Sequence, residues 1–87
     1  MVDSPEKLRS DLLALMLSYR THQHLPTIVA MRKVRECAAR LLAHTCNEVM
    51  IDSYRKVIAG VYAGKYVEVK MMLHMTEDNY YKVYPNV

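Results

Sequence analysis

The chain has 87 residues, of which 52% are hydrophobic and 24% are charged, and its formal net charge is +3. This composition is typical of one folded domain over 1–87 and argues against a disordered chain. The small positive charge would suit an acidic partner, but it does not choose among nucleic acid, a membrane surface and protein.

Two features of the sequence bear on location. The longest apolar run, 12–17, has six residues, whereas a helix that spans a membrane needs about 20. The first residues carry acids where a secretory signal carries bases. We therefore expect a protein of the cytoplasm, or of the nucleus in a eukaryote, without attachment to a membrane.

The first helix is expected over 5–21. Ser4 and Pro5 suit a helix start, because the serine hydroxyl accepts from a free backbone N–H and proline has no N–H to leave unpaired. Leu13 and Leu17 lie opposite the apolar stripe of this helix, so they need a second layer of structure or a partner. The stripe itself comprises Leu8, Leu12, Leu15, Met16 and Tyr19.

Two more helices are expected over 27–44 and 46–63. A break between them is favoured because an unbroken helix would place the charge of Glu48 in its apolar arc. Thr45 and Glu48 have the spacing of a capping box. Gly64 then suits the left-handed residue that commonly closes a helix.

After Gly64 the apolar residues alternate with other residues, and this alternation predicts a strand over 66–75. A polar turn and a second strand over 80–84 complete a C-terminal β-hairpin. The predicted fold is therefore α+β, with three helices followed by a hairpin. A lone hairpin is marginal in water, so this one should pack on the helices or pair with another copy.

An all-α helical hairpin bundle is the alternative. The segment 64–68 resembles the turn between the two helices of a tetratricopeptide repeat, and this resemblance implies a fourth helix over 66–76. The similarity covers about one turn, and the chain has no second repeat unit. It therefore identifies no family.

The sequence shows no catalytic signature, and we expect neither an enzyme nor a bound cofactor. Cys37 and Cys46 are expected to be buried free thiols, because nine helical residues separate them by about 13 Å along the axis. No C-x-x-C pair accompanies the residues that could bind zinc, so no metal site is predicted. Those residues are His22, His24, Cys37, His44 and Cys46.

Aromatic usage favours a role in protein interaction. All seven aromatic residues are tyrosines, and five of them lie in the last 26 residues beside three methionines. Tyrosine and methionine are enriched where proteins meet. We therefore expect a non-catalytic interaction or assembly module that self-associates through the outward hairpin face and the spare stripe of the first helix: Leu13, Leu17, Met72, Tyr81 and Val83.

A small nucleic-acid-binding regulator is the alternative function. Basic residues on the second and third helices could neutralise phosphates, and three helices followed by a hairpin is the order of elements in a winged-helix domain. A solvated face, with Glu36 spaced to form ion pairs, explains the same residues. The candidate contacts are Arg32, Lys33, Arg40, Arg55 and Lys56.

Overall fold

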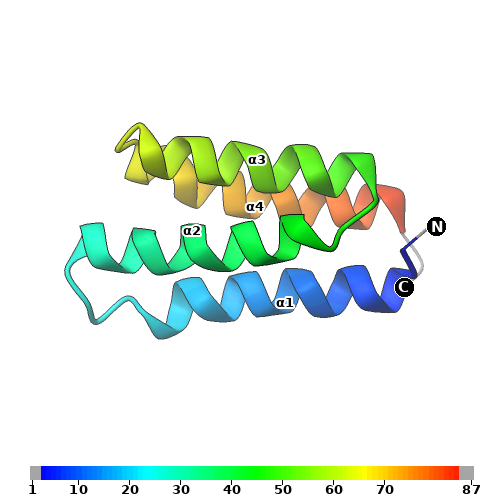
Figure 1. Cartoon of the computed structure of the whole chain (residues 1–87), viewed down its shortest axis with the longest axis horizontal. Helices are drawn as coiled ribbons and strands as arrows, with labels where there is room; N and C mark the ends of the chain where they lie inside the picture. The colour runs from blue at the N-terminus through cyan, green and yellow to red at the C-terminus, as the bar shows by residue number, and fades with distance from the viewer. Residues whose placement is uncertain (1–2, 85–87) are drawn as a thin grey trace.

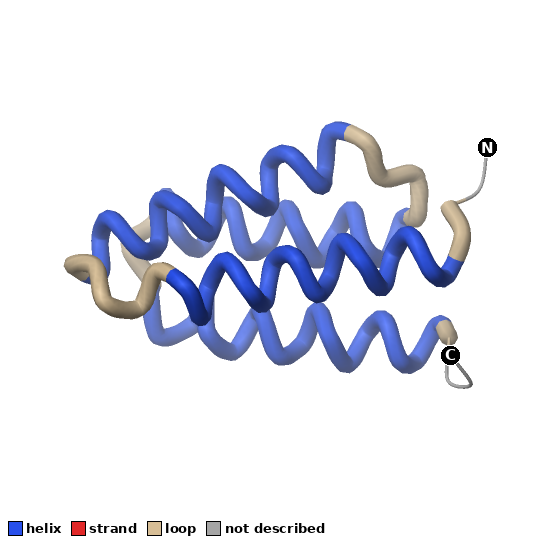
Figure 2. Tube along the Cα trace, turned by 90° about the horizontal axis from the view of Figure 1, so that it is seen from below, coloured by secondary structure: helices blue, strands red, loops and turns tan. Residues whose placement is uncertain are grey.

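Four α-helices make up the structure, a computed structural model that describes residues 3–84. They are α1 (Pro5–Thr21), α2 (Thr27–Ala43), α3 (Glu48–Tyr62) and α4 (Tyr66–Val83). Successive helices run in opposite directions, so α1 begins and α4 ends at the same end of the molecule (Figure 1). Each helix packs against the next, and α4 closes the ring against α1 (Figure 2). The result is an up-and-down four-helix bundle of 36 × 20 × 19 Å.

The helix start predicted at Ser4 is confirmed, whereas the predicted cap of the third helix is wrong. Ser4 Oγ accepts a hydrogen bond from the backbone N–H of Lys7 at 3.1 Å. At the start of α3 the capping residue is Asn47, whose side-chain oxygen accepts from two backbone N–H groups. Thr45, the predicted cap, is instead buried, and its hydroxyl has no partner among the described residues.

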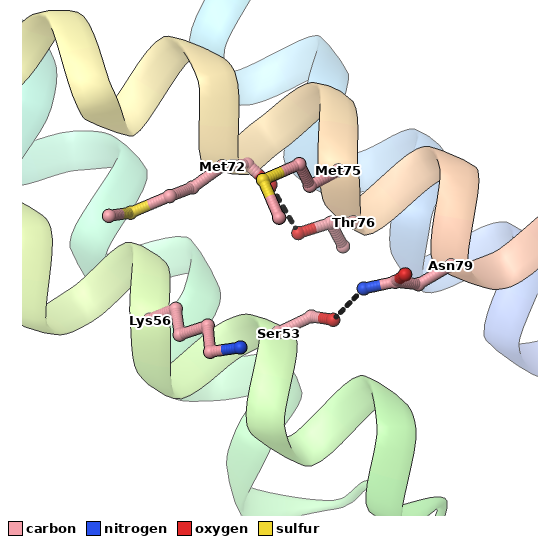
Figure 3. Close-up of a pocket in the computed structure, with 6 residues that line it drawn as sticks. All are labelled: Ser53, Lys56, Met72, Met75, Thr76 and Asn79. Atoms are coloured by element: carbon pink, nitrogen blue, oxygen red, sulfur yellow. Dashed lines mark hydrogen bonds between the residues drawn. The ribbon is translucent and has the colours of Figure 1, made fainter.

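The predicted hairpin is wrong, because α4 occupies the segment from 66 onwards and the described residues contain no strand. The buried residues of α4 follow the helical repeat, with steps of four, three and four. Thr76 Oγ1 donates to the carbonyl of Met72, one helical turn back, at 2.7 Å (Figure 3). The α+β fold class and the winged-helix order of elements are therefore wrong, and the helix of the all-α alternative is present and longer than predicted.

Alternation misled the prediction because a helix with two apolar faces produces it too. Residues two apart on a helix point in nearly opposite directions, since each residue turns the chain by about 100°. The alternating residues of 67–75 therefore split into two stripes on α4. Val69 and Leu73 face the core, while Val67, Met71 and Met75 are exposed.

One glycine in the last turn of α3 and one in the connection to α4 allow these two helices to pack closely. Gly64 has a φ of +69°, and the N–H of Lys65 donates to the carbonyl of Gly60 at 3.0 Å, as in a Schellman motif. A Cβ at Gly60 would lie 2.9 Å from Cγ2 of Val69, so only glycine permits this approach. The helix end predicted at Gly64 is thus confirmed.

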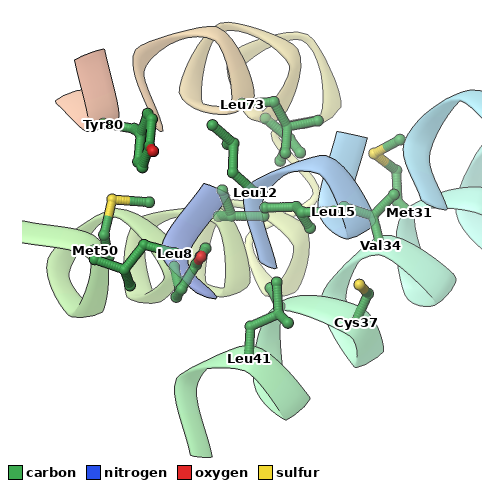
Figure 4. Close-up of a cluster of buried hydrophobic side chains, with 14 residues drawn as sticks. Leu8, Leu12, Leu15, Met31, Val34, Cys37, Leu41, Met50, Leu73 and Tyr80 are labelled. Carbon is green, nitrogen blue, oxygen red and sulfur yellow. The ribbon is translucent and has the colours of Figure 1, made fainter. Parts of the chain in front are cut away.

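The core lies along the bundle axis and draws on all four helices (Figure 4). The apolar stripe predicted for the first helix contributes to it: Leu8, Leu12 and Leu15 are buried, and Met16 and Tyr19 pack against the cluster. Two tyrosines, Tyr54 and Tyr80, are fully buried. The buried cluster consists of Leu8, Leu12, Leu15, Met31, Val34, Cys37, Ala38, Leu41, Met50, Tyr54, Val57, Val69, Leu73 and Tyr80.

Candidate interaction surface

The outer face of α4 exposes three large apolar side chains that the core does not use. Val67, Met71 and Met75 are 76%, 59% and 51% exposed. Their spacing of four residues places them along one side of the helix, whereas Val69 and Leu73 are buried on the other. A helix at the surface of a small bundle normally has one apolar face, so α4 has a second apolar face that no other part of residues 3–84 covers.

A shallow groove between α3 and α4 adjoins this exposed face. Its volume is about 260 Å³, and it is lined by Lys56, Ala59, Gly60, Ala63, Lys65 and Met72. Lys56 and Met72 also line a smaller hollow that Met75 borders (Figure 3). The apolar face and the groove are therefore continuous. We call the apolar part of this region the α4 surface, which consists of Val67, Met71, Met72 and Met75.

The polar side chains beside the α4 surface are engaged with one another. Asn79 Nδ2 donates to Ser53 Oγ at 3.1 Å, and Ser53 Oγ donates to the carbonyl of Val49 at 2.9 Å. Lys56 lies 2.9 Å from Asp52, but both side chains are more than half exposed, so this ion pair contributes little to stability. The polar groups join α3 to α4, and the surface offers a partner mainly apolar contact.

The five residues predicted as a partner interface do not share one surface. Leu13 and Leu17 are exposed on α1, at 53% and 60%. Met72 is half-buried where α4 meets α3, and Tyr81 lies nine residues further on, which is 2.5 turns and therefore the opposite side of α4. Val83 is at the end of the helix. The hairpin face that was to unite Met72, Tyr81 and Val83 does not exist.

Sequence reasoning missed the exposed side of α4 because it placed this segment in a strand. Val67, Met71 and Met75 were not among the residues predicted to form the interface. The signal that could have revealed them is their separation by four residues, combined with a second set at Val69 and Leu73. Two such sets on one segment indicate a helix with two apolar faces.

The basic residues predicted to contact nucleic acid are exposed but lie over different seams of the bundle. Arg32 borders a groove between α2 and α3. Arg40 lies beside Cys37, on the side of α2 that meets α1. Lys56 borders the groove between α3 and α4. Nucleic-acid binding by Arg32, Lys33, Arg40, Arg55 and Lys56 stays a prediction, without the winged-helix fold that suggested it.

The groove between α2 and α3 contains a cation–π contact. The guanidinium carbon of Arg35 lies 4.6 Å from the centre of the Tyr62 ring, close enough for such a contact to be favourable. The groove has a volume of about 220 Å³. Tyr62, the most exposed aromatic side chain of this groove, is therefore already covered on one face of its ring by Arg35.

A polar cluster ties the start of α1 to the loop between α2 and α3. Asp3 Oδ2 accepts hydrogen bonds from the backbone N–H groups of Cys46 at 2.6 Å and Asn47 at 3.2 Å. The bond from Cys46 is the main reason why the pKa of Asp3 lies below its ordinary value. Lys7 Nζ lies 3.4 Å from Asp3 Oδ1 and 3.2 Å from Asp11 Oδ2. These charges stabilise the loop and need no ligand to explain them.

The cysteines differ in environment. Cys37 is buried, as expected, and burial raises the pKa of its thiol. Cys46 is exposed, so its predicted burial is wrong, and both thiols are free. Within residues 3–84, no three histidine, cysteine, aspartate or glutamate side chains are grouped so as to hold a metal ion.

None of the four described helices is both long and apolar enough to cross a bilayer. Comparisons of the chain with protein-family models, with curated proteins and with solved structures find no match. The function proposed below therefore rests on the physical chemistry of the α4 surface.

Proposed function

We propose that this chain is a small, non-catalytic protein-interaction or assembly module that binds its partner through the α4 surface. The observation that supports this role is the exposure of Val67, Met71 and Met75 on a helix whose other face already packs in the core. Complete burial of a fully exposed side chain of this size is worth about 1.5–3 kcal/mol, and Val67, Met71 and Met75 have half to three quarters of their surface left to bury. A partner that covers all three thus gains a substantial driving force.

The chemistry of this surface suits a protein partner. Methionine is flexible and polarisable, so it adapts to irregular apolar surfaces and is enriched in interfaces. Lys56 and Lys65 border the adjoining groove; Lys56 is paired with Asp52, whereas Lys65 takes part in no ion pair among residues 3–84. A partner with an apolar ridge flanked by an acidic residue would therefore match both the apolar part and the rim.

Four residues have shifted pKa values, and burial or hydrogen bonds within the fold explain each shift. These shifts therefore need no catalytic site to explain them, which supports a non-catalytic role. The pKa of Asp3 is lowered by hydrogen bonds from the α2–α3 loop. The pKa values of Cys37, Tyr54 and Tyr80 are raised, chiefly by burial. None of these residues lines the groove beside the α4 surface.

A reducing compartment, the cytoplasm or the nucleus, is the location that we propose. Two free thiols, one of them exposed at Cys46, suit a compartment in which disulfides rarely form.

Two pairs of exposed residues allow a matched test of the proposed function. Met71 and Met75 on α4, and Leu13 and Leu17 on α1, are each four residues apart and similarly exposed. The wild-type chain, Met71→Glu/Met75→Glu and Leu13→Glu/Leu17→Glu would be used as baits in extracts of the native host. We expect a partner, either a second copy or another protein, to be retained by the wild type and the leucine variant and lost by the methionine variant.

Loss of the partner from the leucine variant alone would transfer the docking surface to α1 and contradict the proposal. Capture that is equal for all three baits would also contradict it. Helical circular dichroism of each variant provides the control for folding, and because all four substituted side chains are at least half exposed, the substitutions leave the core intact.

A further inference from the structure

The exposed side of α4, called the outer seam, has opposite charges at equal distances on either side of Met75. Five residues lie at steps of minus seven, minus four, zero, plus four and plus seven from Met75, so they share one side of the helix. In chain order they are Glu68, Met71, Met75, Asn79 and Lys82. The seam therefore begins with an acid, ends with a base and has methionine at its centre.

From this arrangement we infer that the partner of the α4 surface is a second copy of the chain, docked through its own α4 antiparallel to the first. This inference rests on the proposed function and specifies the partner. A two-fold axis at Met75 makes residues at equal distances on either side of Met75 face each other. Glu68 of each copy then meets Lys82 of the other, and the two Met75 side chains meet on the axis.

Charge selects the antiparallel arrangement. A parallel pair of α4 helices would place Glu68 against Glu68 and Lys82 against Lys82, and like charges in direct opposition are destabilising. Within residues 3–84 neither Glu68 nor Lys82 takes part in an ion pair. Both are exposed, so both are available to the second copy.

The length of the seam sets the expected strength. The fourteen residue steps of helix from Glu68 to Lys82 span about 21 Å, so the contact is smaller than the roughly 800 Å² per partner of a standard interface. A weak, reversible dimer with a dissociation constant in the micromolar range is therefore expected. Met72, at the edge of the seam, and the groove between α3 and α4 extend the contact beyond α4 itself.

A charge-exchange experiment tests the inference. Sedimentation equilibrium of the full chain would be measured from about 1 to 500 µM, a range that includes micromolar dissociation constants. Glu68→Lys and Lys82→Glu, each alone, convert two attractive contacts per dimer into two repulsive ones. We expect each to weaken the dimer about tenfold. An equal mixture of the two variants should restore dimerisation, because only the mixed pair places lysine opposite glutamate at both contacts.

Two further variants provide the apolar test and its control. Met75→Glu places two carboxylates on the axis and should weaken the dimer by more than about tenfold. Leu17→Glu, on α1, should leave dimerisation unchanged. A wild type that is monomeric at every concentration would overturn the inference, as would a mixture of the charge variants that remains monomeric or a Leu17→Glu variant that loses the dimer. A monomeric wild type whose bait still captures a different protein, lost in Met71→Glu/Met75→Glu, would overturn only the second-copy inference and leave the proposed function standing.

Discussion

Two buried tyrosines differ in one respect that makes a sharp prediction possible. Tyr54 and Tyr80 are both fully buried in the bundle core. The hydroxyl of Tyr80 donates to the carbonyl of Pro5 at 3.0 Å and so joins the end of α4 to the start of α1. The hydroxyl of Tyr54 has no hydrogen-bond partner among the described residues. The same substitution at the two positions should therefore have opposite effects.

The magnitudes follow from the hydrogen bonding. Tyr80→Phe removes a formed hydrogen bond, which costs about 0.5–1.5 kcal/mol of unfolding free energy. Tyr54→Phe removes a hydroxyl that lost its water on folding without gaining a partner, a penalty of about 1–3 kcal/mol. Removing the hydroxyl therefore removes this penalty, and the small void left by the missing oxygen cancels only a few tenths of a kcal/mol of the resulting stabilisation. We expect Tyr54→Phe to be stabilising by about 1 kcal/mol and the two variants to differ by about 2 kcal/mol.

Urea unfolding followed by circular dichroism at helical wavelengths measures the difference. The slope of unfolding free energy against urea should be unchanged, so that the shift in midpoint reports stability alone. In thermal unfolding the two variants should differ by roughly 10 °C, since 1 kcal/mol shifts the melting temperature of a domain of this size by about 4–8 °C. If Tyr54→Phe is as destabilising as Tyr80→Phe, the Tyr54 hydroxyl has a partner in solution and the reasoning is refuted.

Three further predictions concern α3 and the loop before it. Gly60→Ala should destabilise the chain by about 1 kcal/mol in urea unfolding, because the clash with Val69 exceeds the gain in helix propensity; increased stability would show that the α3–α4 contact can relax. Asn47→Ala should cost about 1 kcal/mol of unfolding free energy because it removes the cap. Thr45→Val should not destabilise the chain in the same assay, because the buried hydroxyl that it removes has no partner among the described residues; the reverse order would favour the predicted capping box at Thr45. The pKa of Asp3 in the folded chain lies below its ordinary value of 3.8, so its carboxylate stabilises the fold at pH values above 3.8. This stabilisation is lost as the pH falls through the lower pKa of the folded state. Urea midpoints measured against pH should show this loss in the wild type and a smaller one in Asp3→Asn.

The first three helices were predictable because local signals and apolar spacing agreed. Ser4 and Pro5 mark the start of α1, and the observed helix has the predicted bounds, while α2 and α3 are shorter than predicted by one to three residues. Asn47 was missed as a cap because Thr45 offers an equally good local pattern. The choice depends on Asp3, which holds the loop from a distant part of the sequence. No local rule contains that contact.

The fourth helix was mispredicted because its sequence satisfies two periodicities over the segment 67–75. Beyond that segment only the helix continues, since Thr76 and Tyr80 extend the buried stripe through what was to be the turn. That supposed turn, 76–79, contains neither glycine nor proline. The predicted interface loses its common face for the same reason: Met72 and Tyr81 share a face across the two strands of a hairpin, but lie on opposite sides of a helix.

The alternation that imitated a strand is also the feature that supports an interaction role. A helix needs one apolar face to join a bundle, and the buried residues of α4 supply it at Val69, Leu73 and Tyr80. Val67, Met71 and Met75 add nothing to that packing and leave apolar surface in water, at an unfavourable free energy of solvation. Polar residues at these positions would make the same helix and the same core. The proposed contact outside the monomer would explain this exposed set, and the opposite charges at Glu68 and Lys82 are the reason for proposing a second α4 as the partner.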